Sequence, residues 1–149
     1  MNEIKKSIMI NCSVRKAFEF HSDTNNLKKI TPDSIKVKIL RMDLPLKEGS
    51  EIELEIMQFG FLKNNWLIKL TAFKENSLIT DTQIKGPFSY WVHDHIFEEA
   101  EGKTKKTDRI RYELPFGILG KIAGKLFVSK MIEKQFEFRH NITKSLLEN

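Results

Sequence analysis

Apolar and polar residues alternate along most of the chain between residues 35 and 113. Ile52, Leu54 and Ile56, for example, alternate with glutamates. Because successive side chains of a strand point to opposite faces, this alternation predicts antiparallel strands with one face in the core and one in water. The pattern predicts strands at residues 3–10, 35–39, 51–56, 62–73, 77–84, 90–99 and 104–113, with turns at Gly60, Asn76, Gly86-Pro87 and Glu101-Gly102.

The last part of the chain changes to a helical period. From residue 118 to about 147, apolar residues recur near helical spacing at Leu119, Ile122, Leu126, Ile132, Phe136 and Leu146, and the stripe is widened by Phe127, Val128, Met131, Phe138 and Ile142. Such a helix spans roughly 45 Å, which exceeds the roughly 33 Å of a ten-residue strand. A helix this long, with so wide an apolar face, is best buried by a sheet that curves around it.

Two short helical segments follow the first strand. Ser13 is a good N-cap for a helix that runs through Phe20, and a second turn covers residues 23–30 before Thr31-Pro32. The sequence therefore predicts an α+β, helix-grip fold, in which a curved antiparallel sheet wraps around a long C-terminal helix. No linker or repeat interrupts it, so residues 1–149 are expected to form one domain.

Composition and charge indicate which classes of partner the protein is expected to bind. The chain of 149 residues is 40% hydrophobic and carries a net charge of +5, but its basic residues are scattered rather than gathered in a stripe. This distribution argues against a nucleic-acid partner and leaves only weak peripheral contact with anionic membranes open. Cys12 is the only cysteine and no apolar run is long enough to cross a bilayer, so we expect a cytoplasmic protein.

The familiar catalytic motifs are absent from the sequence. It contains no phosphate-binding glycine loop, CxxC pair, HExxH or G-x-S-x-G element. The residues that stand out instead lie in the segment 86–97, where Trp91, His93, His95 and Phe97 share one strand face.

The neighbouring strands supply acidic partners for these histidines. With a two-residue turn at Glu101-Gly102, His95 lies opposite Asp108 and Trp91 lies opposite Tyr112. Asp81 of the preceding strand is expected near Trp91 or His93. The result is a predicted polar row on the concave face of the sheet: Asp81, His93, His95 and Asp108.

Several roles are open to this row. The polar groups could satisfy one another in a His–Asp network that fixes strand register, or supply the few polar contacts of an apolar ligand pocket. His93 or His95, oriented by Asp108, could also act as a general base. A single His-x-His pair is a weak metal signal, and we expect no metal and no cofactor. The predicted pocket lining combines the row with Trp66, Trp91, Phe97, Tyr112, Met131 and Phe136.

The order of elements resembles the SRPBCC superfamily, which includes START domains, birch-pollen-allergen-like proteins and polyketide cyclase/dehydrases. The most specific residues are Gly86-Pro87-Phe88, Trp91, His93, His95 and Phe97, followed by Thr104, Asp108, Tyr112, Pro115, Gly117 and Gly120. They are similar to a bacterial cyclase/dehydrase-like or cell-division-inhibitor-like branch. The resemblance implies a hydrophobic cavity between sheet and helix, with Lys106 in place of a common apolar residue, but it does not imply one reaction.

These observations favour a non-enzymatic domain that binds a small hydrophobic molecule such as a lipid, polyketide or isoprenoid. One alternative is a cyclase or dehydratase that uses a His–Asp pair. Another is a regulatory or interaction module without a true ligand, whose protein partners the sequence does not identify.

Overall fold

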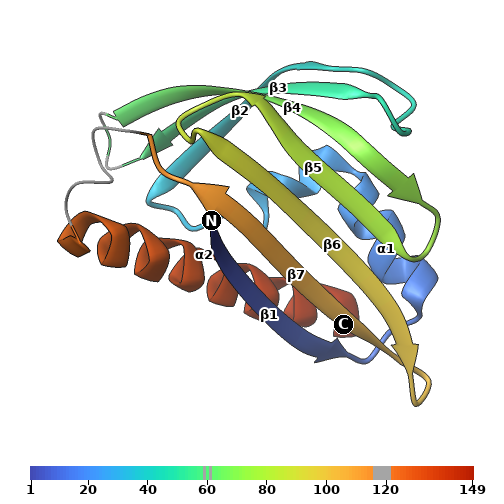
Figure 1. The fold of residues 1–149 in the computed structure, drawn as a ribbon. Coiled ribbons are helices and arrows are strands. Elements are labelled where there is room, and N and C mark those ends of the chain that lie inside the picture. The colour runs from blue at the N-terminus through green and yellow to red at the C-terminus, as the bar shows by residue number, and fades with distance from the viewer. Residues whose placement is uncertain (59, 61, 116–121) are drawn as a thin grey trace.

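Seven antiparallel strands form one curved sheet in the computed structural model, which describes residues 1–58, 60, 62–115 and 122–149. Figure 1 shows this sheet arched over the long helix α2 (Ile122–Glu148), with the helix α1 (Val14–Ser22) at one end. The strands run in the spatial order β1-β7-β6-β5-β4-β3-β2. Their bounds are β1 Asn2–Ile10, β2 Ile35–Met42, β3 Glu51–Gln58, β4 Leu62–Lys74, β5 Leu78–Lys85, β6 Tyr90–Ala100 and β7 Lys103–Glu113. The predicted helix-grip fold is confirmed.

The β6–β7 hairpin has the register that the sequence predicts. Glu101 and Gly102 both have positive φ, at 54° and 74°, as a two-residue turn of a twisted hairpin requires. Ala100 pairs with Lys103, so His95 lies opposite Asp108. The same register places Trp91 opposite Tyr112.

The short helices also begin where their caps predict. The Ser13 side chain accepts a hydrogen bond from the backbone N–H of Lys16 at 3.1 Å, which satisfies one of the free donors at the start of α1. A 3₁₀ helix, η1 (Thr24–Lys28), follows and is capped by Asp23. These two segments close one side of the concave face of the sheet.

The buried face of α2 differs from the predicted stripe. Leu126, Phe127, Phe138 and Leu146 are exposed, at 57%, 62%, 38% and 42% of their surface. The predicted Ile132 and Phe136 are buried, and the buried face continues through His140, Thr143 and Leu147, which the prediction did not include but which follow helical spacing. Two of these five are polar, so the helix contacts the sheet through a narrower apolar face than hydropathy alone indicates. The predicted start of the helix at residue 118, and with it Leu119, Gly117 and Gly120, lies outside the described residues.

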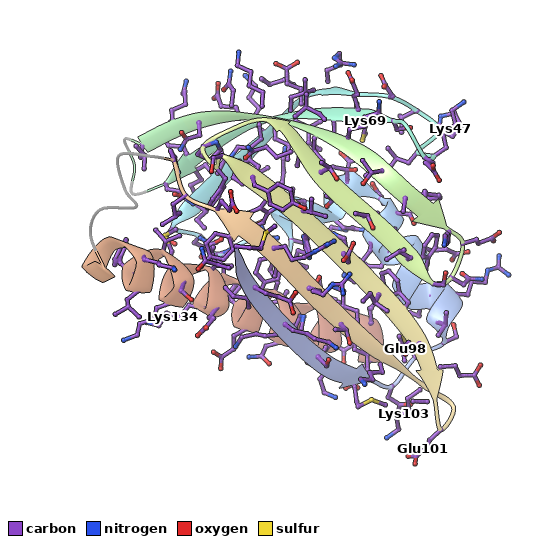
Figure 2. The ribbon with its side chains drawn as sticks, in the orientation of Figure 1. Lys47, Lys69, Glu98, Glu101, Lys103 and Lys134 are labelled. Atoms are coloured by element: carbon purple, nitrogen blue, oxygen red, sulfur yellow. The ribbon has the colours of Figure 1, made fainter. Side chains whose placement is uncertain are left out.

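Two apolar clusters hold the sheet and helices together. One joins α1 to the middle strands through residues such as Phe18, Leu54 and Phe97, and the other joins β7 to α2 through Tyr112 and Phe136. Charged side chains such as Lys69, Glu98 and Lys134 point away from the body of the protein (Figure 2). Arg109 and Arg111, on the outer face of β7, pair there with Asp94. No helix among the described residues is long and apolar enough to cross a bilayer.

Candidate functional site

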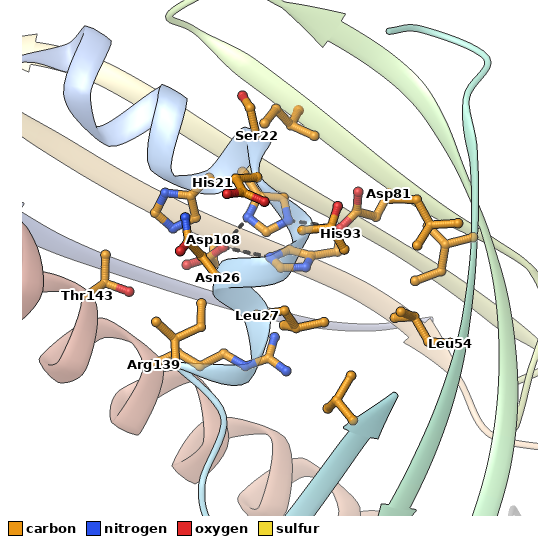
Figure 3. Close-up of a pocket in the computed structure, with 18 of the residues that line it drawn as sticks. His21, Ser22, Asn26, Leu27, Leu54, Asp81, His93, Asp108, Arg139 and Thr143 are labelled. Atoms are coloured by element: carbon orange, nitrogen blue, oxygen red, sulfur yellow. Dashed lines mark hydrogen bonds and ion pairs between the residues drawn. The ribbon is translucent and has the colours of Figure 1, made fainter. Parts of the chain in front are cut away.

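A pocket of about 180 Å³ lies between the concave face of the sheet, η1 and α2. Strands β3 and β4 contribute mainly apolar side chains to its wall, among them Ile52, Leu54, Trp66 and Leu70, and η1 adds Leu27. Strands β5 to β7 and α2 contribute a group of ionisable side chains: Asp81, His93, His95, Lys106, Asp108 and Arg139. The pocket therefore has an apolar part and a polar part, which we call the polar end (Figure 3).

Asp108 is the centre of the polar end. Its Oδ1 lies 2.6 Å from His93 Nε2, and its Oδ2 lies 2.5 Å from His140 Nε2 and also accepts from the Lys106 ammonium. Asp108 is fully buried, and burial alone would raise its pKa. The Lys106 charge and the donated hydrogen bonds outweigh that effect and hold the pKa of Asp108 well below its usual range. Asp108 is thus a carboxylate with both oxygens already engaged.

His95 forms a second pair with Asp81. His95 Nε2 lies 3.0 Å from Asp81 Oδ2, and its Nδ1 lies 3.3 Å from Asp108 Oδ1 but without the alignment of a hydrogen bond. Burial alone would lower the pKa of His95. The two neighbouring carboxylates reverse that effect and raise its pKa above the ordinary value.

The pKa of His93 shifts in the opposite direction from that of His95. Its ring stacks on that of His95 at 3.8 Å between centroids, and two charged rings at that distance would repel each other. Burial, together with the positive charge of His95, lowers the pKa of His93 to about 4 despite its hydrogen bond to Asp108. The two imidazoles therefore titrate in different pH ranges, His93 in the lower one.

The structure brings most of the predicted site residues into one pocket. Seven of them line it: Trp66, Asp81, Trp91, His93, His95, Asp108 and Phe136. Three do not. Phe97 packs edge-on against Phe18 and His21, Tyr112 is buried in the cluster that joins β7 to α2, and Met131 is half-buried one turn away from the lining of α2.

Sequence reasoning missed the polar residues that the helices contribute. His21 of α1 and Arg139 and His140 of α2 all line the pocket. Periodicity could have located His140, because it follows the buried Phe136 by four residues and so lies on the same face. The same spacing could have located His21, because it follows the buried Ala17 by four residues and Phe18 by three.

This arrangement can bind an amphipathic molecule and can also hold protons at defined atoms. The apolar wall offers surface for a hydrocarbon, and the polar end offers cationic donors and an imidazole pair. Three ligand-type side chains, Asp81, His93 and His95, have donor atoms within 4.8 Å of one another.

A sheet curved over a long C-terminal helix, with a pocket between them, defines a helix-grip domain of the START-like class. The family model described as "Polyketide cyclase / dehydrase and lipid transport" matches residues 10–136. The chain therefore belongs to this family, and the resemblance to the SRPBCC superfamily is confirmed.

Solved structures show the same fold at low sequence identity. The protein TTHA0849 from Thermus thermophilus is 16% identical, with a TM-score of 0.78, and the match covers 97% of this chain and 95% of that one. A START superfamily protein from Mycobacterium smegmatis is 13% identical, with a TM-score of 0.72 and 98% and 97% coverage. Ara h 8.0201 is 14% identical, with a TM-score of 0.67 and 97% and 98% coverage. Among curated proteins, no match to the chain was found.

Proposed function

We propose that this protein binds a small hydrophobic molecule, such as a lipid, polyketide or isoprenoid, in the pocket between the sheet and α2. The observation that carries the proposal is the division of the pocket into an apolar wall and a polar end. Burying apolar ligand surface against that wall is favourable by roughly 25 cal/mol per Å². The family and the fold support ligand binding in general. We place the protein in the cytoplasm, where a lone cysteine suits a reducing compartment.

Ligand binding can be measured with the neutral dye N-phenyl-1-naphthylamine, whose fluorescence rises in apolar surroundings. Both tryptophans of the chain line the pocket, so their emission should also change when the dye binds. Native mass spectrometry of freshly purified protein should reveal any molecule carried over from the cell. Protein that neither binds the dye nor carries a small molecule would contradict the proposal.

A matched pair of variants tests whether the dye occupies this pocket. Ile56→Phe adds volume on the pocket wall, and we expect it to weaken dye binding several-fold. Ile84→Phe makes the same change at a residue of β5 that is 54% exposed, and should leave binding unchanged. Equal effects of the two substitutions would place the dye elsewhere.

The His95–Asp81 pair favours a second candidate function, that of a cyclase or dehydratase. An imidazole held by a carboxylate beside a pocket can donate or accept a proton during such a reaction. If a substrate is found, His95→Ala should abolish turnover while dye binding survives. Turnover that persists in both His95→Ala and His93→Ala would exclude this function.

A further inference from the structure

Arg139 enters the pocket from the side opposite the polar strands. Figure 3 shows its side chain reaching from α2 toward the sheet, and Arg139 is part of the pocket lining. Its guanidinium carbon lies 5.0 Å from the centre of the Phe136 ring, which supports the group from one side. The side chain is half-buried because the pocket is open to water, but its Nε atom is wholly enclosed and has no hydrogen-bond partner among the described residues.

The carboxylates of the polar end act on this guanidinium from a distance, and neither forms an ion pair with it. Asp108 is engaged by Lys106, His93 and His140, and Asp81 is engaged by His95. No carboxylate in the described part of the chain lies within ion-pair distance of Arg139. A guanidinium carries five donors in a planar fork, and an enclosed donor without a partner is unfavourable. The pocket therefore contains a cation that has no ion-pair partner among the described residues.

The charges at the polar end determine whether a metal ion or an anion is favoured as the species that binds beside Arg139. Asp81 and Asp108 bring two negative charges, and Lys106 and Arg139 bring two positive charges, before any histidine is counted. The Arg139 charge is close enough to Lys106 to contribute to lowering the pKa of that ammonium, although burial is the main cause. An added metal cation would be repelled by both cationic groups, and the two carboxylates that could attract it are already engaged by protein donors. An anion would be attracted by the one that has no carboxylate partner.

Resting on the proposed function, we propose that the ligand of this pocket is an amphipathic carboxylate and that Arg139 binds its carboxylate group. Arginine suits a planar carboxylate because its fork can donate two parallel hydrogen bonds. A single guanidinium without a partner matches one negative charge, which favours a carboxylate over a doubly charged phosphate. The hydrocarbon part of the ligand then lies along the wall formed by β3 and β4.

The test compares ligands that share one alkyl chain and differ only in the polar group. Decanoate, decan-1-ol, decylamine and decyl phosphate each compete with N-phenyl-1-naphthylamine, and the concentration that displaces half of the dye is measured. A hydrogen-bonded charge pair in a pocket is expected to favour decanoate over decan-1-ol by about tenfold or more. Decylamine should displace the dye least well.

Two variants that lose the same charge assign the effect to Arg139. Arg139→Gln should remove the preference for decanoate and leave the displacement by decan-1-ol unchanged. Lys134→Gln removes one positive charge from an exposed residue of the same helix and should keep the preference (Figure 2). If Arg139→Gln does not fold, the ligand series on the unaltered protein tests the preference for a carboxylate, and Arg139→Lys, which keeps the charge but loses the planar fork, should weaken that preference if Arg139 is the binding group.

The outcomes separate this inference from the proposed function. Dye binding with equal displacement by decanoate and decan-1-ol would overturn the carboxylate assignment and leave the hydrophobic pocket intact. Tighter binding of decyl phosphate than of decanoate would overturn the choice of headgroup. Thermal stabilisation by Zn²⁺ but not by decanoate would show a metal site and overturn the inference. Failure to bind the dye at all would contradict the proposed function itself.

Discussion

Asp108 joins three separate parts of the chain at one carboxylate. Lys106 lies two residues before it on the same face of β7, His93 is its neighbour on β6, and His140 comes from α2. Removing one partner from such a buried group leaves an uncompensated charge, so the members stabilise one another even if the group as a whole adds little net stability. The contacts of Asp108 support the interpretation of the polar row as a hydrogen-bonded network, and contact of the row with a ligand remains part of the proposal.

Residue-level charges predict an unusual order of histidine titration. At pH 6 we expect His95 to be mostly protonated, because Asp81 raises its pKa, while His21 and His93 are neutral, because burial lowers theirs. The chain has four histidines, so NMR of the imidazole carbons can follow each through a titration. A His93 signal that titrates near 6.5 would contradict the lowered pKa that burial and the neighbouring His95 ring give this imidazole.

The same shifts give the sign of the pH dependence of stability. His93 has a folded pKa of about 4, below its unfolded value, so its contribution is complete above pH 6.5 and is lost as the pH falls toward 4, by at most roughly 3 kcal/mol. His95 acts in the opposite sense, because its contribution is complete below pH 6.5 and disappears as the pH rises through its raised pKa. Urea unfolding between pH 7 and 4.5 should show a shallower acid loss in His93→Gln.

At the scale of elements, the β6–β7 hairpin was predictable because its turn leaves little choice. Glycine tolerates positive φ, and a two-residue loop in this setting fixes which residues face each other across the strands. The pairing of His95 with Asp108 follows directly from counting back from Gly102. The turn and its two strands are contiguous in the chain, so their register can be predicted from one sequence.

The same hairpin yields a stability prediction. Glu101 has φ of 54°, a conformation that Asn adopts more readily than Glu. Glu101→Asn should therefore raise the free energy of unfolding by about 0.5–1 kcal/mol, measured by urea unfolding. Glu99→Asn provides the control, because it places Asn at a strand position near the end of β6, where Asn is unfavourable. A Glu101→Asn protein that is less stable than the parent would contradict the turn geometry.

The helix α2 was predicted as an element but not in its orientation. Its buried face includes His140 and Thr143, which hydropathy assigns to water, and it excludes Phe127, which hydropathy assigns to the core. For His140 the sheet offers the Asp108 carboxylate, which lies 32 positions away in sequence. Periodicity places His140 on the buried face, but its contact with Asp108 is set by tertiary packing and could not be predicted from that pattern.

At the scale of the whole molecule, the fold class and the strand residues of the polar end could be predicted from the sequence, and the residues that the helices add to the pocket were not predicted. Alternation along the strands and one long terminal helix leave few arrangements that bury both. The pocket depends instead on where α1, η1 and α2 meet the concave face, and each helix contributes a titratable side chain there, apart from η1. Strand parity could supply Asp81, His93, His95 and Asp108, but it carried no information on Arg139.

The pairing of the first strand with the last has a consequence for biosynthesis. Residues 2–10 align with residues 104–112, and no other strand of the described chain borders β1. During translation at about 5–20 residues per second, the amino-terminal segment waits roughly 5–20 s before its partner has been made. Nascent β1 therefore leaves the ribosome as an unpaired, partly apolar strand, a stage at which chaperones have the opportunity to shield it.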